Sequence, residues 1–127
     1  MAFTSIATGL QHIGVPTNDM ARTLAFYTAL GFEVAHQTEN NGEKVAFLKL
    51  GDLMIETYEN GKAVGQPGAV DHIAINVTDV GEARRIADEM GLEVIEENTL
   101  PTFWENGVRY FIILGPNREK LEFNQYL

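Results

Sequence analysis

Cysteine is absent from the 127-residue chain, which excludes a disulfide framework and any thiolate nucleophile or metal ligand. Basic residues are scarce as well, since nine Lys and Arg stand against 18 Asp and Glu and leave a net charge of −9. Contact with phosphate groups requires clustered Lys and Arg. We therefore expect neither nucleic acid nor an anionic membrane surface among the partners of this protein.

Long apolar runs are also missing. No stretch approaches the ~20 consecutive apolar residues that a membrane-spanning helix needs. Residues 1–9 contain neither the basic run nor the apolar core of a targeting leader. We expect a soluble, cytoplasmic protein whose length is enough for one ordinary domain with a sizeable core.

The sequence does contain an internal repeat. The segment VDHIAINV at 70–77 resembles LQHIGV at 10–15, and a shift of 60 positions aligns 12–34 with 72–94 without a gap. Six residues of the first segment are identical to their counterparts: His12, Ile13, Asp19, Gly31, Glu33 and Val34. Chance rarely places so many matches in one register, so we interpret the chain as two copies of one module. Each copy alone would leave a sheet face open, so the copies should fold as one unit or pair with another chain.

Each module is predicted to run strand, helix and then three strands. The alternation of apolar and polar residues predicts strands at 10–15, 32–39, 44–50 and 53–58, and again at 70–77, 92–97, 108–114 and 120–126. Pro16 is expected to end the first strand because it cannot donate to a ladder. Asn18 or Asp19 can cap the first helix, and Gly31 fits the left-handed position that ends it.

The second helix is predicted over 80–90. Asp79 and Glu82 have the spacing of a capping box. Its apolar residues fall at helical spacing and should form a buried stripe of Val80, Ala83, Ala87 and Met90.

One acidic residue interrupts the apolar pattern in the last strand of each module. Glu56 lies within Met54-Ile55-Glu56-Thr57, and Glu122 lies within Lys120-Leu121-Glu122-Phe123. Burying a carboxylate without a partner is costly, so both residues are candidates for a site. With His12 and His72 they occupy equivalent places in two modules, and a rough twofold axis between the modules would bring all four side chains together.

Imidazole nitrogen and carboxylate oxygen, without sulfur, suit one divalent transition metal per site: Ni, Zn, Co, Mn or Fe(II). Four protein ligands in an octahedral shell leave two adjacent positions for water or for two neighbouring oxygens of a substrate. Such a site stabilises the enolate that forms when the adjacent C–H is deprotonated, and a carboxylate beside the metal can move the proton.

The doubled module and the four ligand positions resemble the vicinal oxygen chelate superfamily, most closely its glyoxalase I (lactoylglutathione lyase) branch. The resemblance covers about residues 10–125. It implies an α+β fold of two tandem βαβββ modules, with curved mixed sheets around a metal cleft. The chain would then be a single glyoxalase-like domain over 1–127. Module one would span about 10–58, the linker about 59–69 and module two about 70–126.

The resemblance also implies roles for the four residues. By motif, the metal ligands are His12, Glu56, His72 and Glu122. Glu122 would be the leading candidate for general base, Glu56 the opposing acid or base, and the metal would stabilise an enediolate. A small-molecule substrate and a homodimer are expected, with the cleft assembled within one chain or between two.

Pro16 stands where glutathione-using members usually have an arginine, so the resemblance supports the metal site more strongly than a thiol substrate. Three alternatives stay open. An acyl-CoA epimerase would typically have glutamine in place of Glu56, and an extradiol-type dioxygenase would bind iron through two histidines and one carboxylate. A metal-free protein of the bleomycin-resistance type would sequester a drug without this ligand set.

Further residues have two interpretations each. Phe103 and Trp104 lie in a long loop and could line a substrate pocket or cover a core edge. Arg109 could meet an anionic substrate or form a cross-strand ion pair. His36 is expected to be a surface residue.

Overall fold

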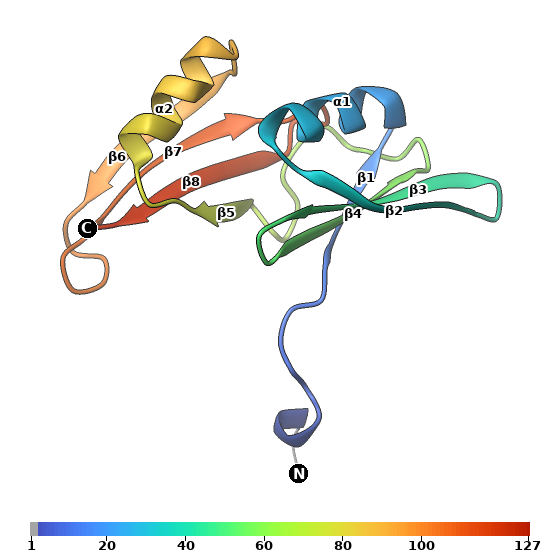
Figure 1. The fold of residues 1–127 in the computed structure, drawn as a ribbon, viewed down its shortest axis with the longest axis horizontal. Helices are drawn as coiled ribbons and strands as arrows, with labels where there is room; N and C mark the ends of the chain where they lie inside the picture. Colours follow the sequence, from blue (N-terminus) through green and yellow to red (C-terminus); the bar gives the residue numbers. More distant parts are fainter. Residues whose placement is uncertain (1–2) are drawn as a thin grey trace. The chain divides into compact units, whose positions relative to one another are not determined.

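The computed structural model describes residues 3–127 and divides into two compact units, with the boundary between Ala63 and Val64. Figure 1 shows the elements along the chain. The first unit contains a 3-10 helix η1 (Phe3–Ser5), β1 (Ile13–Thr17), α1 (Met20–Leu30), β2 (Glu33–Asn40), β3 (Glu43–Leu50) and β4 (Leu53–Glu59). The second contains β5 (His72–Asn76), α2 (Val80–Glu89), β6 (Val94–Leu100), β7 (Val108–Leu114) and β8 (Lys120–Tyr126).

Each unit is built around one mixed sheet of four strands. The strand order is β1-β4-β3-β2 in the first unit and β5-β8-β7-β6 in the second. In both, the first strand pairs parallel with the last, and the remaining pairs are antiparallel. One helix in each unit completes the order βαβββ, which confirms the predicted α+β fold of tandem βαβββ modules.

The two sheets share an irregularity that extends the repeat. The register of β2 against β3 shifts between Val34 and His36, and that of β6 against β7 shifts between Val94 and Glu96. These bulges lie 60 residues apart, the same offset that aligns the histidines. Glu96 is therefore the counterpart of His36. His36 itself is exposed, as predicted.

Pro16 does not end the first strand, and that prediction is wrong. It lies within β1, opposite Tyr58 of β4. β1 is an edge strand that pairs only with β4 among the described strands. An edge strand has one unpaired side, so a residue without an N–H donor is tolerated there.

Both helices begin after an aspartate: Asp19, one of the two residues predicted for the first helix, and Asp79, predicted for the second. Asp19 and Asp79 are N-caps whose carboxylates accept hydrogen bonds from the backbone N–H of Arg22 and Glu82, at 3.0 and 2.9 Å. Gly31 ends α1 in the left-handed conformation with φ 105°. At the end of α2, Met90 is 37% exposed and does not join the predicted buried stripe, because it lies beyond the last helical residue.

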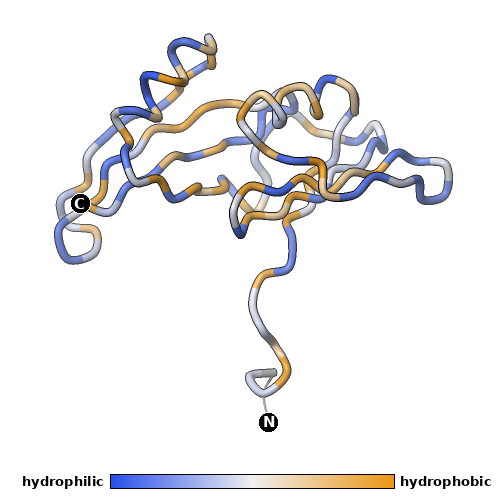
Figure 2. Tube along the Cα trace, in the orientation of Figure 1, coloured by the Kyte–Doolittle hydropathy of each residue, from blue (hydrophilic) through white to orange (hydrophobic). Residues whose placement is uncertain are grey.

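A pair of fully buried aliphatic residues marks the same face of each sheet. In the first unit Leu48 and Ile55 are fully buried and lie opposite each other. In the second unit Ile113 and Leu121 occupy the matching positions. Figure 2 shows hydrophobic residues running along β7. Successive side chains on a strand point to opposite faces, so Glu56 and Glu122, each next to a core isoleucine or leucine, lie on the other face.

None of the helices in the described part of the chain is long and apolar enough to span a membrane.

Candidate functional site

The first unit brings together His12 and Glu56. His12 directly precedes β1, and Glu56 lies on β4 opposite Gly14. The distance from His12 Nε2 to Glu56 Oε1 is 3.4 Å, and the two side chains are 34% and 28% exposed. The other ring nitrogen, Nδ1, lies 2.9 Å from Oε1 of Gln11. Phe47 packs edge-on against the imidazole, with ring centroids 5.8 Å apart.

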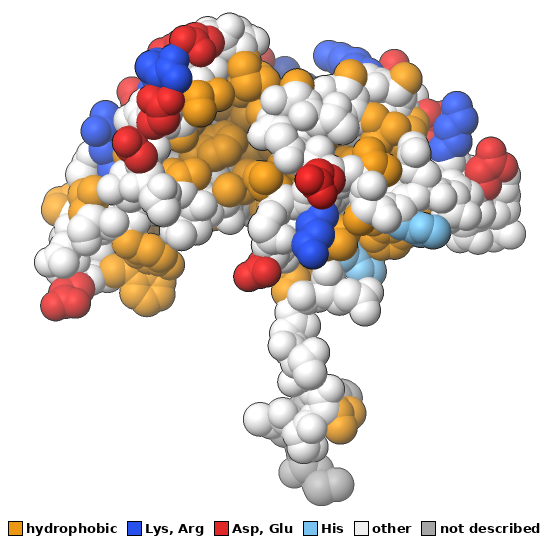
Figure 3. Space-filling model, in the orientation of Figure 1, with side chains coloured by type: hydrophobic (Ala, Val, Ile, Leu, Met, Phe, Trp, Pro, Cys, Tyr) orange, Lys and Arg blue, Asp and Glu red, His pale blue; other side chains and the backbone are white. Residues whose placement is uncertain are grey.

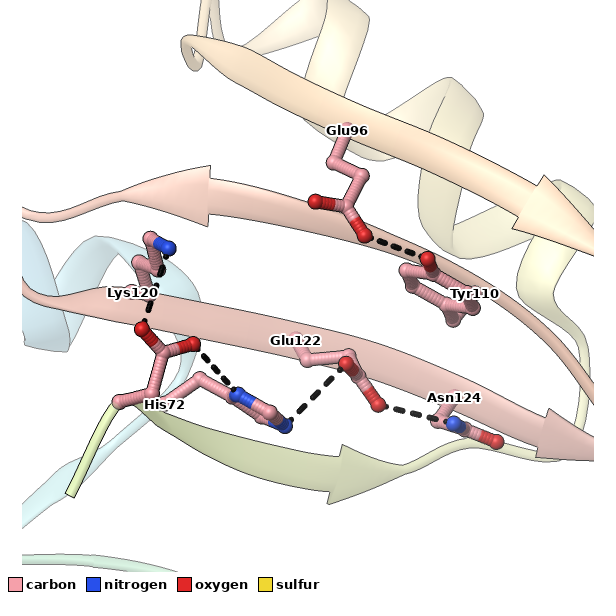
Figure 4. Close-up of polar contacts among 7 residues, drawn as sticks. His72, Glu96, Tyr110, Lys120, Glu122 and Asn124 are labelled. Carbon is pink, nitrogen blue, oxygen red and sulfur yellow. Dashed lines mark hydrogen bonds and ion pairs between the residues drawn. The ribbon is translucent and has the colours of Figure 1, made fainter.

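The second unit repeats this arrangement with His72 and Glu122 (Figure 4). His72 Nε2 lies 3.5 Å from Glu122 Oε1, and its Nδ1 lies 2.9 Å from Oδ2 of Asp71. The Glu122 side chain is only 11% exposed. Its second oxygen, Oε2, accepts a hydrogen bond of 2.8 Å from Nδ2 of Asn124.

The two pairs share a geometry suited to metal ligands. In each, the residue preceding the histidine presents an acceptor oxygen to Nδ1, which favours a proton on Nδ1 and leaves the lone pair of Nε2 directed toward the glutamate. Distances of 3.4 and 3.5 Å are long for a hydrogen bond. Two ligand atoms that each lie ~2.1 Å from one metal ion are on the order of 3.0 to 3.4 Å apart. The donor set therefore fits a divalent transition metal.

Neither pair is a complete site. Within residues 3–127, no group of three or more His, Asp or Glu side chains is placed to hold a metal ion. Each unit supplies one imidazole and one carboxylate on the open face of its sheet. The structure thus brings His12 to Glu56 and His72 to Glu122.

The sheet face around Glu122 is hollowed. A depression of about 240 Å³ is lined by Asp71, His72, Glu96, Leu100, Phe103, Tyr110, Ile112, Glu122 and Asn124. A second depression of about 250 Å³ is lined by Ala74, Asn76, Trp104, Asn124 and Tyr126. The two share Asn124, so they adjoin each other along β8.

Two further carboxylates belong to the first of these hollows. Asp71 accepts hydrogen bonds from His72 and from Lys120, the latter at 3.3 Å, and these bonds lower the pKa of its carboxyl group. Glu96 accepts a hydrogen bond from the hydroxyl group of Tyr110. That bond, burial of the phenol and the negative charges of Glu96 and Glu122 raise the pKa of Tyr110 to about 12.

Phe103 and Trp104 line the hollows, whereas Arg109 does not. Phe103 lines the first hollow and Trp104 the second. Arg109 alternates with Tyr110 along β7 and lies beside Thr99 and Gln125, on the opposite face of the sheet from Glu122. Within the second unit, the structure does not bring Arg109 to the hollows.

Several residues at these sites were not predicted. Asn124 follows Glu122 by two positions, and strand alternation places it on the same face. The offset of 60 would have identified Glu96 as the counterpart of His36. His36 itself faces Phe47, with ring centroids 6.1 Å apart, on the same face as Glu56. The hydrogen bonds of Gln11 and Asp71 depend on side-chain rotamers, which the sequence pattern does not reveal.

Known proteins resemble this chain both in sequence and in fold. YwbC of Bacillus subtilis, an uncharacterized protein, is 32% identical over 131 residues, which cover 94% of this chain and 99% of YwbC. The fosfomycin resistance protein FosX from Listeria monocytogenes, solved with Mn(II) and sulfate, aligns with a TM-score of 0.75 at 19% identity and covers 96% of this chain and 95% of its own. A lactoylglutathione lyase from Agrobacterium tumefaciens aligns with a TM-score of 0.72 at 18% identity, covering 94% and 95% of the two chains.

Residues 9–123 match a single family, and the tandem βαβββ fold agrees with it. The chain therefore belongs to the Glyoxalase/Bleomycin resistance protein/Dioxygenase superfamily, the vicinal oxygen chelate proteins.

Proposed function

We propose that this protein is a divalent-metal-dependent lyase or isomerase that moves a proton next to a carbonyl group, on a substrate held through two oxygens. Lactoylglutathione lyase, the glyoxalase I reaction, is the nearest named activity. One observation supports the proposal above all. The pair of His Nε2 and Glu Oε1 occurs twice, at 3.4 and 3.5 Å, with the same support for Nδ1 each time.

One pair from each of two modules, in the same chain or in two chains, would complete the ligand set His12, Glu56, His72 and Glu122. The support of each Nδ1 by a neighbouring oxygen is typical of metal-binding histidines. Nitrogen and oxygen donors suit Ni, Zn, Co, Mn or Fe(II). When bound, the metal would polarise the substrate oxygens and stabilise negative charge on them. A homodimer is part of the proposal.

Glu122 is the proposed general base. Its side chain is only 11% exposed, and Asn124 holds Oε2 while Oε1 faces His72. A carboxylate fixed in this way can accept a proton from a substrate carbon within its reach and return it to the neighbouring carbon. Glu56 is the proposed opposing acid or base, and its side chain is more exposed, at 28%.

The proposal does not specify glutathione as the thiol of the substrate. Pro16 offers no positive charge to a glutathione carboxylate, and the described residues that line the first hollow include neither Lys nor Arg. Lys120 contacts the rim residue Asp71 but does not itself line the hollow. A neutral carrier or no thiol at all fits these surroundings better than an anionic tripeptide.

The test is elemental analysis of protein purified without chelator or polyhistidine tag, beside His72→Ala and a His36→Ala control. We expect close to one transition metal per site, lost in His72→Ala and kept in His36→Ala. Turnover is then assayed with methylglyoxal and several thiols. Absence of metal in the unaltered protein, even after loading with nickel, zinc, cobalt and manganese, would contradict the proposal and favour a ligand-sequestering protein.

A further inference from the structure

The loop between β6 and β7 places exposed aromatic rings beside the proposed catalytic face. Trp104 is 74% exposed and Tyr126 58% exposed, although both are large apolar side chains. Their rings meet edge to face, with centroids 5.7 Å apart, and both line the second hollow. Figure 3 shows exposed hydrophobic side chains at this end of the second unit. A loop that only covered the core would bury the Trp104 ring, whereas Tyr126 comes from the end of β8.

The loop is held in a defined conformation. Trp104 has a left-handed backbone with φ 58°, which is unusual for a bulky residue and is tolerated where surrounding structure imposes it. Gly107 has φ 89°, and a Cβ atom there would lie 2.9 Å from Cα of Pro101. The carbonyl group of Gly107 accepts a hydrogen bond of 3.0 Å from the N–H of Leu127. The Trp104 ring is therefore presented by a fixed turn.

The floor of the second hollow is polar and connects it to Glu122. Asn76 and Asn124 are register partners on β5 and β8 and line the hollow together. Because Nδ2 of Asn124 donates to Glu122, its amide oxygen points away from that carboxylate, as Figure 4 shows. This oxygen is an acceptor for a ligand that already contacts Glu122 in the first hollow.

We propose that the second hollow binds a planar aromatic group of the substrate, packed against the Trp104 and Tyr126 rings, with a hydrogen-bond donor directed at the amide oxygen of Asn124. The substrate class is an uncharged or cationic aryl compound with adjacent hydroxyl and carbonyl oxygens. The inference rests on the proposed function, because those oxygens would be held at the His72–Glu122 pair. A hollow of about 250 Å³ exceeds the ~150 Å³ that accommodates benzene.

Charge favours this class over an anionic one. Asp71, Glu96 and Glu122 all line the adjoining hollow, and Lys120 is bonded to Asp71. An anionic substituent would be repelled by Glu96 and Glu122. A neutral ring instead gains contact with two aromatic side chains.

Trp104 is the one tryptophan of the chain, so its fluorescence reports on the hollow directly. Metal-loaded protein is titrated with 2-hydroxyacetophenone and, as the aliphatic comparison, hydroxyacetone. Excitation at the red edge of the tryptophan band avoids tyrosine, and N-acetyltryptophanamide corrects for absorption by the ligand. We expect saturable quenching by the aryl compound, with an affinity about tenfold above that of hydroxyacetone.

Two variants of the same loop are compared by calorimetry. Trp104→Leu should weaken binding of the aryl compound about tenfold and leave hydroxyacetone binding unchanged. Phe103→Leu, on the first hollow, should not remove the preference for the aryl compound. Circular dichroism and metal content are recorded for each variant, and the titration of the unaltered protein decides the matter if Trp104→Leu does not fold.

The outcomes separate this inference from the proposed function. Equal affinity for both compounds in metal-loaded protein would overturn the aromatic subsite while the metal chemistry stands. Saturable quenching by the aryl compound in protein that binds no metal would support the subsite and contradict the proposed enzyme. If quenching is absent and Trp104→Leu converts a dimer to a monomer, the rings form a contact between copies of the chain and the inference is wrong.

Discussion

At the scale of single residues, the neighbours that hold the two histidines are as informative as the proposed ligands themselves. Gln11 and Asp71 each precede a histidine by one position and each face its Nδ1 at 2.9 Å. A carboxylate support makes the imidazole a stronger donor than an amide support does. The repeated module therefore keeps the geometry of the pair while it varies the electrostatics, and His72 would be the stronger metal ligand of the two under the proposed function.

Glu122→Gln separates metal binding from proton transfer. The amide retains an oxygen that can face the metal but cannot accept a proton as a carboxylate does, so we expect much of the metal to remain and turnover to fall by about 10²-fold or more. Metal analysis and kcat on the same preparation measure the two effects. Glu96→Gln, on β6 and separated from β8 by β7, is the matched control. Unchanged kcat in Glu122→Gln would remove its role as base.

At the scale of elements, the sequence predicted the order of strands and helices because the signals for it are local. Asp19 and Asp79 cap helices as predicted, and Asn41-Gly42 forms the turn between β2 and β3 with positive φ at both residues. The error at Pro16 has a non-local cause, since a strand's position at the edge of a sheet depends on pairing across the chain. Met90 was misplaced because periodicity does not fix the last turn of a helix.

The ligand candidates were visible for a similar reason, whereas their surroundings were not. Strand alternation and the repeat were enough to identify His72 and Glu122 as candidates. The hollows depend instead on the path of the loop between β6 and β7 and on the left-handed backbone of Trp104. No local pattern of residues predicts that conformation for tryptophan.

The side-chain hydrogen bond from Tyr110 on β7 to Glu96 on β6 predicts how stability depends on pH. Tyr110 donates to Glu96, and its pKa of about 12 lies above the ~10 of an unfolded tyrosine. The folded state thus holds the proton more tightly, so the stabilisation is complete below about pH 10 and is lost as pH rises toward about 12. In a tyrosinate absorbance titration, Tyr110→Phe should remove one late ionisation from those of the four tyrosines.

Two further variants complete that titration. Glu96→Gln should shift the late ionisation to lower pH because the negative charge beside the phenol is gone. Tyr126→Phe, which alters an exposed tyrosine, should leave it in place. A late step that keeps its full amplitude in Tyr110→Phe would contradict the assignment to Tyr110.

At the scale of the whole molecule, duplication explains why one chain has two histidine–glutamate pairs. Each described unit presents one histidine and one glutamate on the open face of its sheet, and no unit holds a third ligand candidate beside them. If both pairs serve one metal, His12→Ala and His72→Ala should each abolish the metal-dependent rise in Tm, since a ligand stabilises only the state that binds it. Loss in one variant alone would show that a single pair suffices.

Mixing these two variants distinguishes a site within one chain from a site between two. In a dimer whose sites each join module one of one chain to module two of the other, a mixed dimer has one site with both substitutions and one site with none. Mixed dimers form half of a random mixture, so about a quarter of the unaltered activity and metal should return after unfolding and refolding the variants together. A site within one chain always contains one substitution, and the mixture then stays inactive. Separately refolded variants, combined afterwards at low temperature, are the control for exchange.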